Sequence, residues 1–379
     1  MTTPTLPSME VAPEIKRSRV TWHGIKTVAR LELTQRLRSS RWRTVLVLWF
    51  IGVGAICLLI AAALTSSMGY NDTPVGPMIF ALNVMFILFM GLLVTPSLSS
   101  TAINGDRNAG TLAILQASLL TPMEITLGKL AAGWLSSVSF IVVSIPFIVW
   151  SLAAGGVTII TVVVVLLTMC LLLGVICAVS LYMSARMVKT GTSTVMSYLV
   201  VASVSVITLI LFGLSTVVFV FNQNASSMQP TKWDPDTGNP TQCAPVELTY
   251  SNPRTDLTWW LLAANPFVII ADVHVAAPQA QLGGFSQEDP LQTISTGVRE
   301  LRAGFEESYN YEAMWCNPDG SVVSEAEFNE RNNKPPRQAG AVWPYGIGIY
   351  LAVGALAVNR TANRLRTPYD QLAKGVRIA

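Results

Sequence analysis

Few residues of this chain have the types and spacing that catalysis requires. Gly128-Lys129 could end a phosphate-binding loop, but Leu130 follows the lysine and the upstream glycine of such a loop is missing. Asp272 and His274 could hold a metal ion, although two ligands on one loop are few and a solvated pair is the alternative. We therefore expect no catalytic residue, no metal site and no cofactor on this chain.

The cysteines indicate one covalent link. Cys57, Cys170 and Cys177 lie inside apolar runs, where cysteine usually packs as a small apolar residue. Cys243 and Cys316 lie instead in a long polar segment. In an oxidising compartment these two would form a disulfide, and two unpaired thiols are the alternative.

The amino-acid composition indicates the class of protein. Of the 379 residues, 51% are hydrophobic and 12% are charged, and the mean hydropathy is +0.48. Soluble domains carry roughly 25% charged residues. The chain is therefore predicted to be a membrane protein that crosses the bilayer several times.

Six stretches are apolar over the roughly 20 residues that a membrane-spanning helix needs. They contain no Asp, Glu, Lys or Arg between their ends, and they cover residues 44–64, 76–97, 130–153, 157–183, 194–221 and 341–358. The predicted fold is an all-α polytopic membrane protein with six transmembrane helices, of which residues 44–221 hold the first five.

The distribution of Lys and Arg predicts the orientation. Residues 16–43 carry nine basic residues against one acid, Glu32, and the tail 359–379 is also basic. The segment 222–341 carries fifteen acidic residues against seven basic ones. By the positive-inside rule both termini are cytoplasmic and the segment 222–340 is external, in the plasma or inner membrane of the cell.

The external segment is predicted to fold. Its stretch 257–271 is too short for a further span and is interrupted at Asn265-Pro266, which favours a re-entrant or interfacial helix pair. A buried strand is the alternative. After Asp289-Pro290, apolar residues recur at helical spacing and predict an external helix; they are Leu291, Ile294, Val298, Leu301 and Phe305.

The N-terminal segment 1–43 contains a predicted helix before the first span. Its apolar residues recur at helical spacing between Lys and Arg residues; they are Trp22, Ile25, Ala29, Leu33 and Leu37. This pattern is typical of an amphipathic helix at the cytoplasmic lipid surface, with its basic residues near anionic headgroups. A solvated basic leader is the alternative.

Residues 105–129, GDRNAGTLAILQASLLTPMEITLGK, connect the second and third spans. Asn108 could cap a helix that ends before Thr121-Pro122, and MEITLGK would then form a short turn into the third span. One face of this helix is apolar and has no core of its own: Leu112, Leu115 and Leu119. Such a surface favours the docking of a partner, and an interfacial helix packed under the bundle is the alternative.

This stretch resembles the signature of the ABC-2 type permeases, the membrane subunits of ABC transporters with the type V (ABCG-like) fold. The matching residues are Asp106, Arg107, Gly110, Thr111, Leu112, Leu115, Pro122, Gly128 and Lys129. A basic helix containing Glu32, six spans and an NPF segment at 265–267 agree with the resemblance. The stretch departs from the usual acid-rich form at Asn108-Ala109 and at Ala113, and the external segment is longer than in many members.

The resemblance implies that residues 106–127 form a cytoplasmic coupling helix, which sits in a groove of an ATP-binding cassette ATPase subunit. The N-terminal helix would be the connecting helix beside that subunit. The residues implied to bind the partner are Asp106, Arg107, Gly110, Thr111, Leu112, Leu115 and Leu119. ATP and Mg²⁺ would be held by the partner subunit, so this chain would not itself be an enzyme.

The resemblance also implies a second permease, either another copy or a homologue, with spans two and five of both permeases around the substrate path. Candidates for lining that path are Asn83, Phe86, Phe89, Tyr198, Ser203, Thr208 and Phe212. Packing between helices is the alternative role of each. Membrane lipid is the remaining expected partner, and no nucleic-acid partner is expected.

The predicted function is that of a permease subunit of an ATP-driven exporter for a hydrophobic or amphipathic substrate. A drug, a peptide antibiotic and a lipid all stay open as substrates. The alternative is a non-transporting membrane anchor or sensor whose external segment binds a ligand or a protein partner. An ion-coupled carrier is disfavoured because the spans lack the charged residues that such carriers use.

Overall fold

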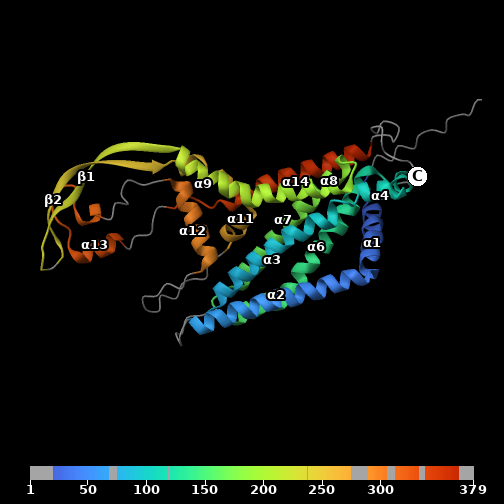
Figure 1. Cartoon of the computed structure of the whole chain (residues 1–379), viewed down its shortest axis with the longest axis horizontal. Helices are drawn as coiled ribbons and strands as arrows, with labels where there is room; N and C mark the ends of the chain where they lie inside the picture. Colours follow the sequence, from blue (N-terminus) through green and yellow to red (C-terminus); the bar gives the residue numbers. More distant parts are fainter. Residues whose placement is uncertain are drawn as a thin grey trace, which may run out of the picture.

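The computed structural model describes residues 20–67, 75–117, 120–236, 238–274, 289–304, 312–332 and 338–366. The molecule is elongated, with a bundle of long helices in its middle (Figure 1). One helix lies across one end of the bundle, and a β-hairpin projects from the opposite end (Figure 1).

Among the described residues, five helical segments are long and apolar enough to cross a membrane. They are α2 (Ser40–Ser67), α3 (Gly76–Ser99) with its extension α4 (Asn104–Asn108), α6 (Pro122–Ala153), α7 (Ile159–Arg186), and the run of α8 (Thr190–Ala202), η1 (Ser203–Ile207) and α9 (Thr208–Val218). A helix satisfies its own backbone hydrogen bonds, which hydrocarbon surroundings require. The chain is therefore a helical membrane protein of the multi-pass type.

The sixth predicted span, 341–358, lies in α14 (Trp343–Leu365). Its 23 residues would measure about 34 Å, which is long enough for the hydrocarbon core. Its composition does not place it among the five apolar segments, since it begins with Trp343-Pro344-Tyr345 and contains Asn359 and Arg360. The sixth span therefore stays a prediction.

The bundle is built around α3 and α7. In each of them 56% of the most apolar stretch is buried, against 17% in α2 and in the run from α8 to α9. Phe80, Leu88, Met169, Leu172 and Leu173 form the centre of the core and are at most 1% exposed. The two outer segments consequently have many apolar side chains on the surface of this single chain.

The helix across the end of the bundle is α1 (Trp22–Arg38) (Figure 1). Thr21 caps it, and the chain turns sharply at Ser39 before α2. Its buried residues are Gly24, Val28 and Ala29, and of these Gly24 and Val28 lie against α6. The predicted helix is therefore present, but Trp22 and Leu37 from its predicted apolar stripe are 76% and 62% exposed.

The connection between α3 and α6 differs from the prediction of one helix starting at Asn108. Asn108 ends α4 instead of capping a helix, and Gly110 takes a positive φ of 72° before α5 (Thr111–Ala117). Glycine adopts this backbone conformation without a steric penalty, so the chain turns there. Leu119 lies outside the described residues.

The predicted short turn MEITLGK is also wrong, because Pro122 already begins α6. Thr121 and Glu124 form a capping box at that point: the Thr121 hydroxyl accepts from the Glu124 amide, and the Glu124 carboxylate accepts from the Thr121 amide. This local arrangement satisfies two amides that would otherwise lack helical partners. The helix α6 thus begins about two turns before the apolar run of the third predicted span.

The end of the molecule opposite α1 contains a two-stranded antiparallel hairpin, β1 (Val220–Trp233) and β2 (Pro240–Pro253). No strand was predicted here, because the polar sequence of β1 lacks the alternation of apolar and polar residues that marks a half-buried strand. The hairpin directly follows α9, so it projects away from the bundle (Figure 1).

The predicted disulfide between Cys243 and Cys316 is present. It joins β2 to the segment that contains η3 (Glu312–Trp315) and α13 (Glu325–Asn332). Trp315 stacks on Phe328 with ring centroids 3.8 Å apart. The hairpin and this segment therefore share a small apolar core of their own.

The stretch 257–271 forms two short helices, α10 (Trp260–Ala263) and α11 (Pro266–Asp272), and not the alternative strand. The predicted external helix is α12 (Pro290–Ala303), capped by Asp289. Along its stripe Leu291 and Val298 are buried, while Ile294 is 39% exposed; Phe305 lies outside the described residues.

Candidate functional site at the basic end of the bundle

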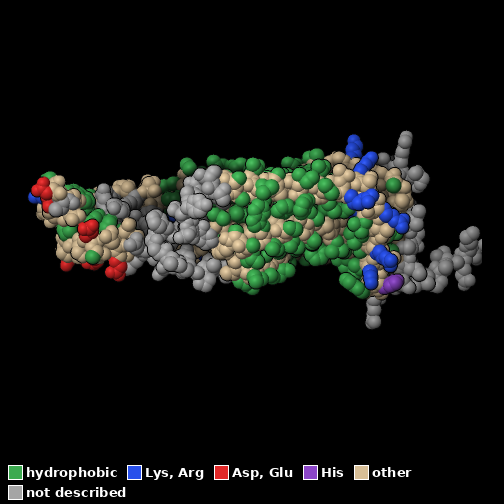
Figure 2. All heavy atoms as spheres, turned by 90° about the horizontal axis from the view of Figure 1, so that it is seen from below, with side chains coloured by type: hydrophobic (Ala, Val, Ile, Leu, Met, Phe, Trp, Pro, Cys, Tyr) green, Lys and Arg blue, Asp and Glu red, His purple; other side chains and the backbone are tan. Residues whose placement is uncertain are grey.

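Charged side chains are sorted between the two ends of the molecule. In Figure 2, Lys and Arg gather at the end that carries α1, Asp and Glu gather at the hairpin end, and hydrophobic side chains cover the middle. We call the part formed by α1, α4, α5 and the start of α6 the basic end. The residues of the motif 105–129 that the structure describes lie there.

An ion triad joins three helices at the basic end. The ammonium group of Lys129 in α6 donates to Glu32 in α1, and it donates to Asp106 in α4 at 2.5 Å. The side chain of Lys129 is 0% exposed, and those of Glu32 and Asp106 are 17% and 30% exposed. A buried ammonium group is strongly destabilising unless carboxylates surround it, so the three helices are held in one arrangement.

Close backbone packing reinforces this arrangement between α1 and α6. A Cβ atom on Gly128 would lie 2.5 Å from Cβ of Val28, and one on Gly24 would lie 2.7 Å from the Glu124 carboxyl carbon. The Thr21 amide also donates to Glu124 at 2.7 Å. The interface therefore has no space for a side chain at Gly24 or at Gly128.

Arg36 links α1 to the end of α3. Its Nη2 atom donates to the carbonyl of Leu98 at 2.9 Å. Burial lowers the pKa of the Arg36 guanidinium, and the nearby Glu32 carboxylate offsets part of that effect. The connecting helix predicted before the first span is thus tied to both α3 and α6.

The apolar side of α5 faces the bundle and not the outside. Leu112 is 5% exposed and lies in a cluster with Ile103, Ile125 and Leu365, and Leu115 packs against the same cluster. The expectation of an apolar face without a core is therefore wrong for these two leucines. The start of α6 and the end of α14 supply the missing core.

A buried polar network connects α4 to the later spans. Asn104 is 0% exposed; its Nδ2 donates to Ser193 in α8 at 2.8 Å, and its Oδ1 accepts from Ser184 in α7 at 3.0 Å. Sequence reasoning missed this network and the ion triad as units. The sequence did contain a sign of the triad, since Glu32 is the lone acid of a basic segment. It contained no sign of the network, because short polar residues inside spans do not indicate which residues they contact.

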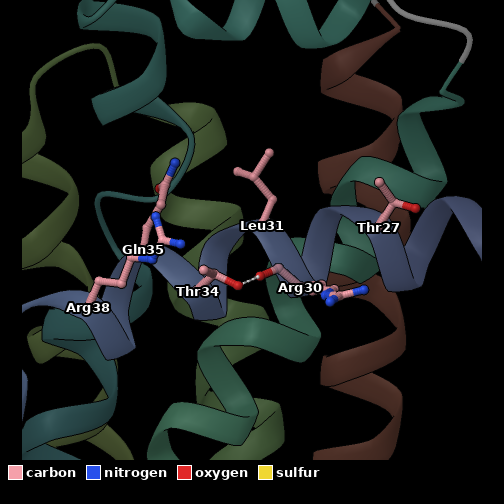
Figure 3. A pocket seen from close by; sticks show the side chains of 6 residues that line it. All are labelled: Thr27, Arg30, Leu31, Thr34, Gln35 and Arg38. Atoms are coloured by element: carbon pink, nitrogen blue, oxygen red, sulfur yellow. Dashed lines mark hydrogen bonds between the residues drawn. The ribbon is translucent and has the colours of Figure 1, made fainter.

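The outer surface of the basic end remains available to a partner. Asn108, Ala109 and Thr111 are exposed at the turn between α4 and α5. The outer side of α1 forms a shallow depression, in which Thr34 donates to the carbonyl of Arg30 at 2.7 Å (Figure 3). That depression is lined by Thr27, Arg30, Leu31, Thr34, Gln35 and Arg38 (Figure 3).

Among the sequence motif residues, Asp106 belongs to the triad, Gly110 supplies the positive φ, and Thr111 is exposed. Arg107 lies next to Asp106 in α4 and is half-buried. The motif therefore contributes residues of two kinds. Some join the helices to each other, and others form the outer surface.

The path candidates do not form one group. Phe89 is 47% exposed and Ser203 is exposed, while Asn83 is buried and donates to Cys57 at 3.2 Å. Tyr198 donates to the carbonyl of Leu93 at 2.9 Å.

The other three candidates are at least partly buried. Thr208 contacts Asn265 at 3.1 Å, and Phe86 and Phe212 pack partly buried against apolar clusters. The structure thus places Asn83 and Thr208 in contacts within the chain, and it leaves Phe89 and Ser203 on its surface.

Comparison with known proteins gives no independent identification, since no family model matches the chain and no curated protein matches it.

Proposed function

We propose that the chain is the membrane permease subunit of an ATP-driven exporter of the ABC-2 type. The observation that carries this proposal is the ion triad of Glu32, Lys129 and Asp106, which makes α1, α4 and α6 one stiff unit at the basic end. A force applied to the exposed turn at Thr111 would act on α3 and α6 together. This is the mechanical connection that a permease needs to an external motor.

In this proposal the basic end is cytoplasmic and the hairpin end is external. The sorting of charge in Figure 2 supports it, because basic residues gather on the cytoplasmic side of membrane proteins. The helix α14 would then be the sixth span and would return the chain to the cytoplasmic side. An ATP-binding cassette ATPase would bind the outer surface of α4, α5 and α1.

The energy for transport would come from that ATPase, which would hold ATP and Mg²⁺. The apolar segments contain no Asp or Glu that could carry protons in mid-membrane. A second permease would cover part of the open apolar surface of α8 and α9. Phe89 and Ser203, which this chain leaves on its surface, would then border a path for a hydrophobic or amphipathic substrate.

The test uses the exposed turn and not the buried leucines. Leu112→Asp would place a charge in an apolar cluster and would damage the fold whether or not a partner binds. Thr111→Trp instead adds bulk at an exposed position. We expect this variant to purify as a folded chain that loses both the ATPase subunit and ATP-dependent transport.

Thr44→Trp is the matched control, since Thr44 is an exposed threonine at the start of α2. It should retain the ATPase subunit and transport. The proposal would be overturned if the chain, purified gently from its native membrane, carried no ATPase activity and Thr111→Trp changed nothing.

A membrane sensor is the second candidate, and the core shared by the hairpin and the segment 312–332 favours it. Such a folded external part could bind a ligand without any transport. Thr111→Trp separates the two functions, because external binding by a sensor would not depend on the exposed turn at the opposite end.

A further inference from the structure

The fifth apolar segment is interrupted by a π-helical turn. Between α8 and α9, η1 (Ser203–Ile207) replaces the α-helical pattern, and the amide of Thr208 donates to the carbonyl of Ser203, five residues earlier. A π turn contains one more residue than an α turn, and such turns are rare and frequently lie at functional sites. The interruption has no proline or glycine to explain it.

Asn265 stabilises this turn from outside the helix. It is 0% exposed, and its Nδ2 atom donates to the carbonyl of Ser205 at 2.8 Å and to the Thr208 hydroxyl at 3.1 Å. Its Oδ1 atom accepts from the amides of Phe267 and Val268 and so caps α11. All hydrogen-bonding groups of this amide side chain are thus used, on two different elements.

The other end of α11 is fixed as firmly. Asp272 is 1% exposed, and its carboxylate accepts from the amides of Val342 and Trp343 at the start of α14. It also accepts from Arg299 in α12 at 2.7 Å. The helix α11 therefore connects the π turn to α12 and to the start of α14.

The helix α8 is held by a different set of contacts. Ser193 is bonded to Asn104, Thr194 lies 2.9 Å from the Ser100 hydroxyl, and Tyr198 donates to the carbonyl of Leu93. These contacts join α8 to α3 and α4, whereas Asn265 joins η1 and the start of α9 to α11. The π turn lies between these two sets of contacts.

We propose that the fifth span moves about η1, and that Asn265 is the positioning residue that holds the π turn. If the turn became α-helical, α8 would rotate relative to α9 by about 100°, the angle of one residue. The Ser205 hydroxyl, which is buried and has no hydrogen-bond partner among the described residues, would then change its surroundings. As a step in a transport cycle, this inference rests on the proposed function.

The test measures the geometry of the fifth span in the full-length chain in lipid nanodiscs. Nitroxide labels are placed at Val195→Cys and Val218→Cys, which are exposed positions on either side of the turn and roughly 35 Å apart along the helix. Cys170→Ala removes the half-buried thiol, and Cys57 and Cys177 are fully buried. The readout is the distribution of label-to-label distances.

Asn265→Ser should retain the cap of α11, because serine is a good capping residue, and should lose the donation to Ser205. We expect the population of a second label-to-label distance to grow about tenfold. This is the change in the equilibrium between the two conformations that follows from one lost buried hydrogen bond of roughly 1.4 kcal/mol. Thr208→Val should shift the distribution in the same direction. Thr216→Val is the control, since the Thr216 hydroxyl donates only to Gly213 within α9 among the contacts described, and it should leave the distribution unchanged.

Distributions of Asn265→Ser and Thr208→Val that match the wild type would overturn the inference. If Asn265→Ser did not fold, Thr208→Val alone would decide. In the complex with the ATPase subunit, the wild-type distribution should shift when a non-hydrolysable ATP analogue binds. Absence of that shift would overturn the role of the π turn in transport. Absence of any ATPase subunit would overturn the proposed function, but not the movement of the fifth span about η1.

Discussion

At the scale of single residues, the ammonium group of Lys129 is held in place at the basic end by two ion pairs. It lies between carboxylates from two other helices, and its side chain is fully buried. A buried ammonium group is strongly destabilising without its carboxylate partners, here Glu32 and Asp106. Any movement of α1 or α4 away from α6 therefore has an electrostatic cost.

Lys129→Met is expected to destabilise the chain by about 2–4 kcal/mol, because it leaves two partly buried carboxylates without their shared cation. Thermal unfolding of the purified protein measures this as a lower Tm. Combining Lys129→Met with Glu32→Gln and Asp106→Asn should recover part of the loss. An unchanged Tm for the single variant would show that the triad contributes little.

At the scale of elements, the contact of α1 with α6 depends on two glycines. Gly24 and Gly128 let the two helices approach so closely that the triad can form across them. The amphipathic pattern of α1 was predictable, but the face it buries was not. A helix at a membrane surface can bury its apolar stripe in lipid or against protein, and only the approach of α6 selects the face that contains Gly24 and Val28.

Gly128→Val is expected to displace α1, because even a Cβ at this position would lie 2.5 Å from Cβ of Val28. Trypsin should then cleave faster after Arg30 and Arg38, by at least severalfold, in a timed digest of the protein in detergent. Gly191→Ala, at a position with no atom within 4 Å of the added carbon, is the control. Equal cleavage rates in both variants would contradict the close packing of α1.

At the scale of the whole molecule, the two ends differ in charge and in covalent structure. The basic end is held by ion pairs and apolar packing, whereas the hairpin end is closed by the disulfide of Cys243 and Cys316. A disulfide persists in an oxidising compartment. The proposed orientation therefore predicts which face of the membrane exposes these cysteines.

In intact cells, reduction of the disulfide followed by a membrane-impermeant maleimide should label Cys243, which is partly exposed, without permeabilisation. The intramembrane cysteines Cys57 and Cys177 should stay unlabelled, because they are 0% exposed. Labelling of the loop cysteines only after permeabilisation would reverse the orientation. The variant Cys243→Ala/Cys316→Ala should lose all external labelling and serves as the blank.

The features that the sequence by itself determined are those that depend on composition and local spacing. Long apolar runs require helices in hydrocarbon, so five spans follow from the chain alone. Helical spacing predicted α12, and the break at Asn265-Pro266 favoured the helix pair. The disulfide was predicted with two unpaired thiols as the alternative, and the structure confirms the disulfide. The boundaries of the helices were predicted less well. A capping box begins α6 at Pro122 and a positive φ turns the chain at Gly110, and hydropathy reports neither feature.

Only the tertiary structure decided which side chains meet. Lys129, Asp106 and Glu32 are far apart in the sequence, and their contact depends on how α1 crosses α6. The burial of Leu112 depends on α14, which lies more than two hundred residues later. The pairing of Asn265 with Ser205 likewise needs α11 to lie against the fifth span. Such contacts arise from packing between distant segments, for which local periodicity carries no information.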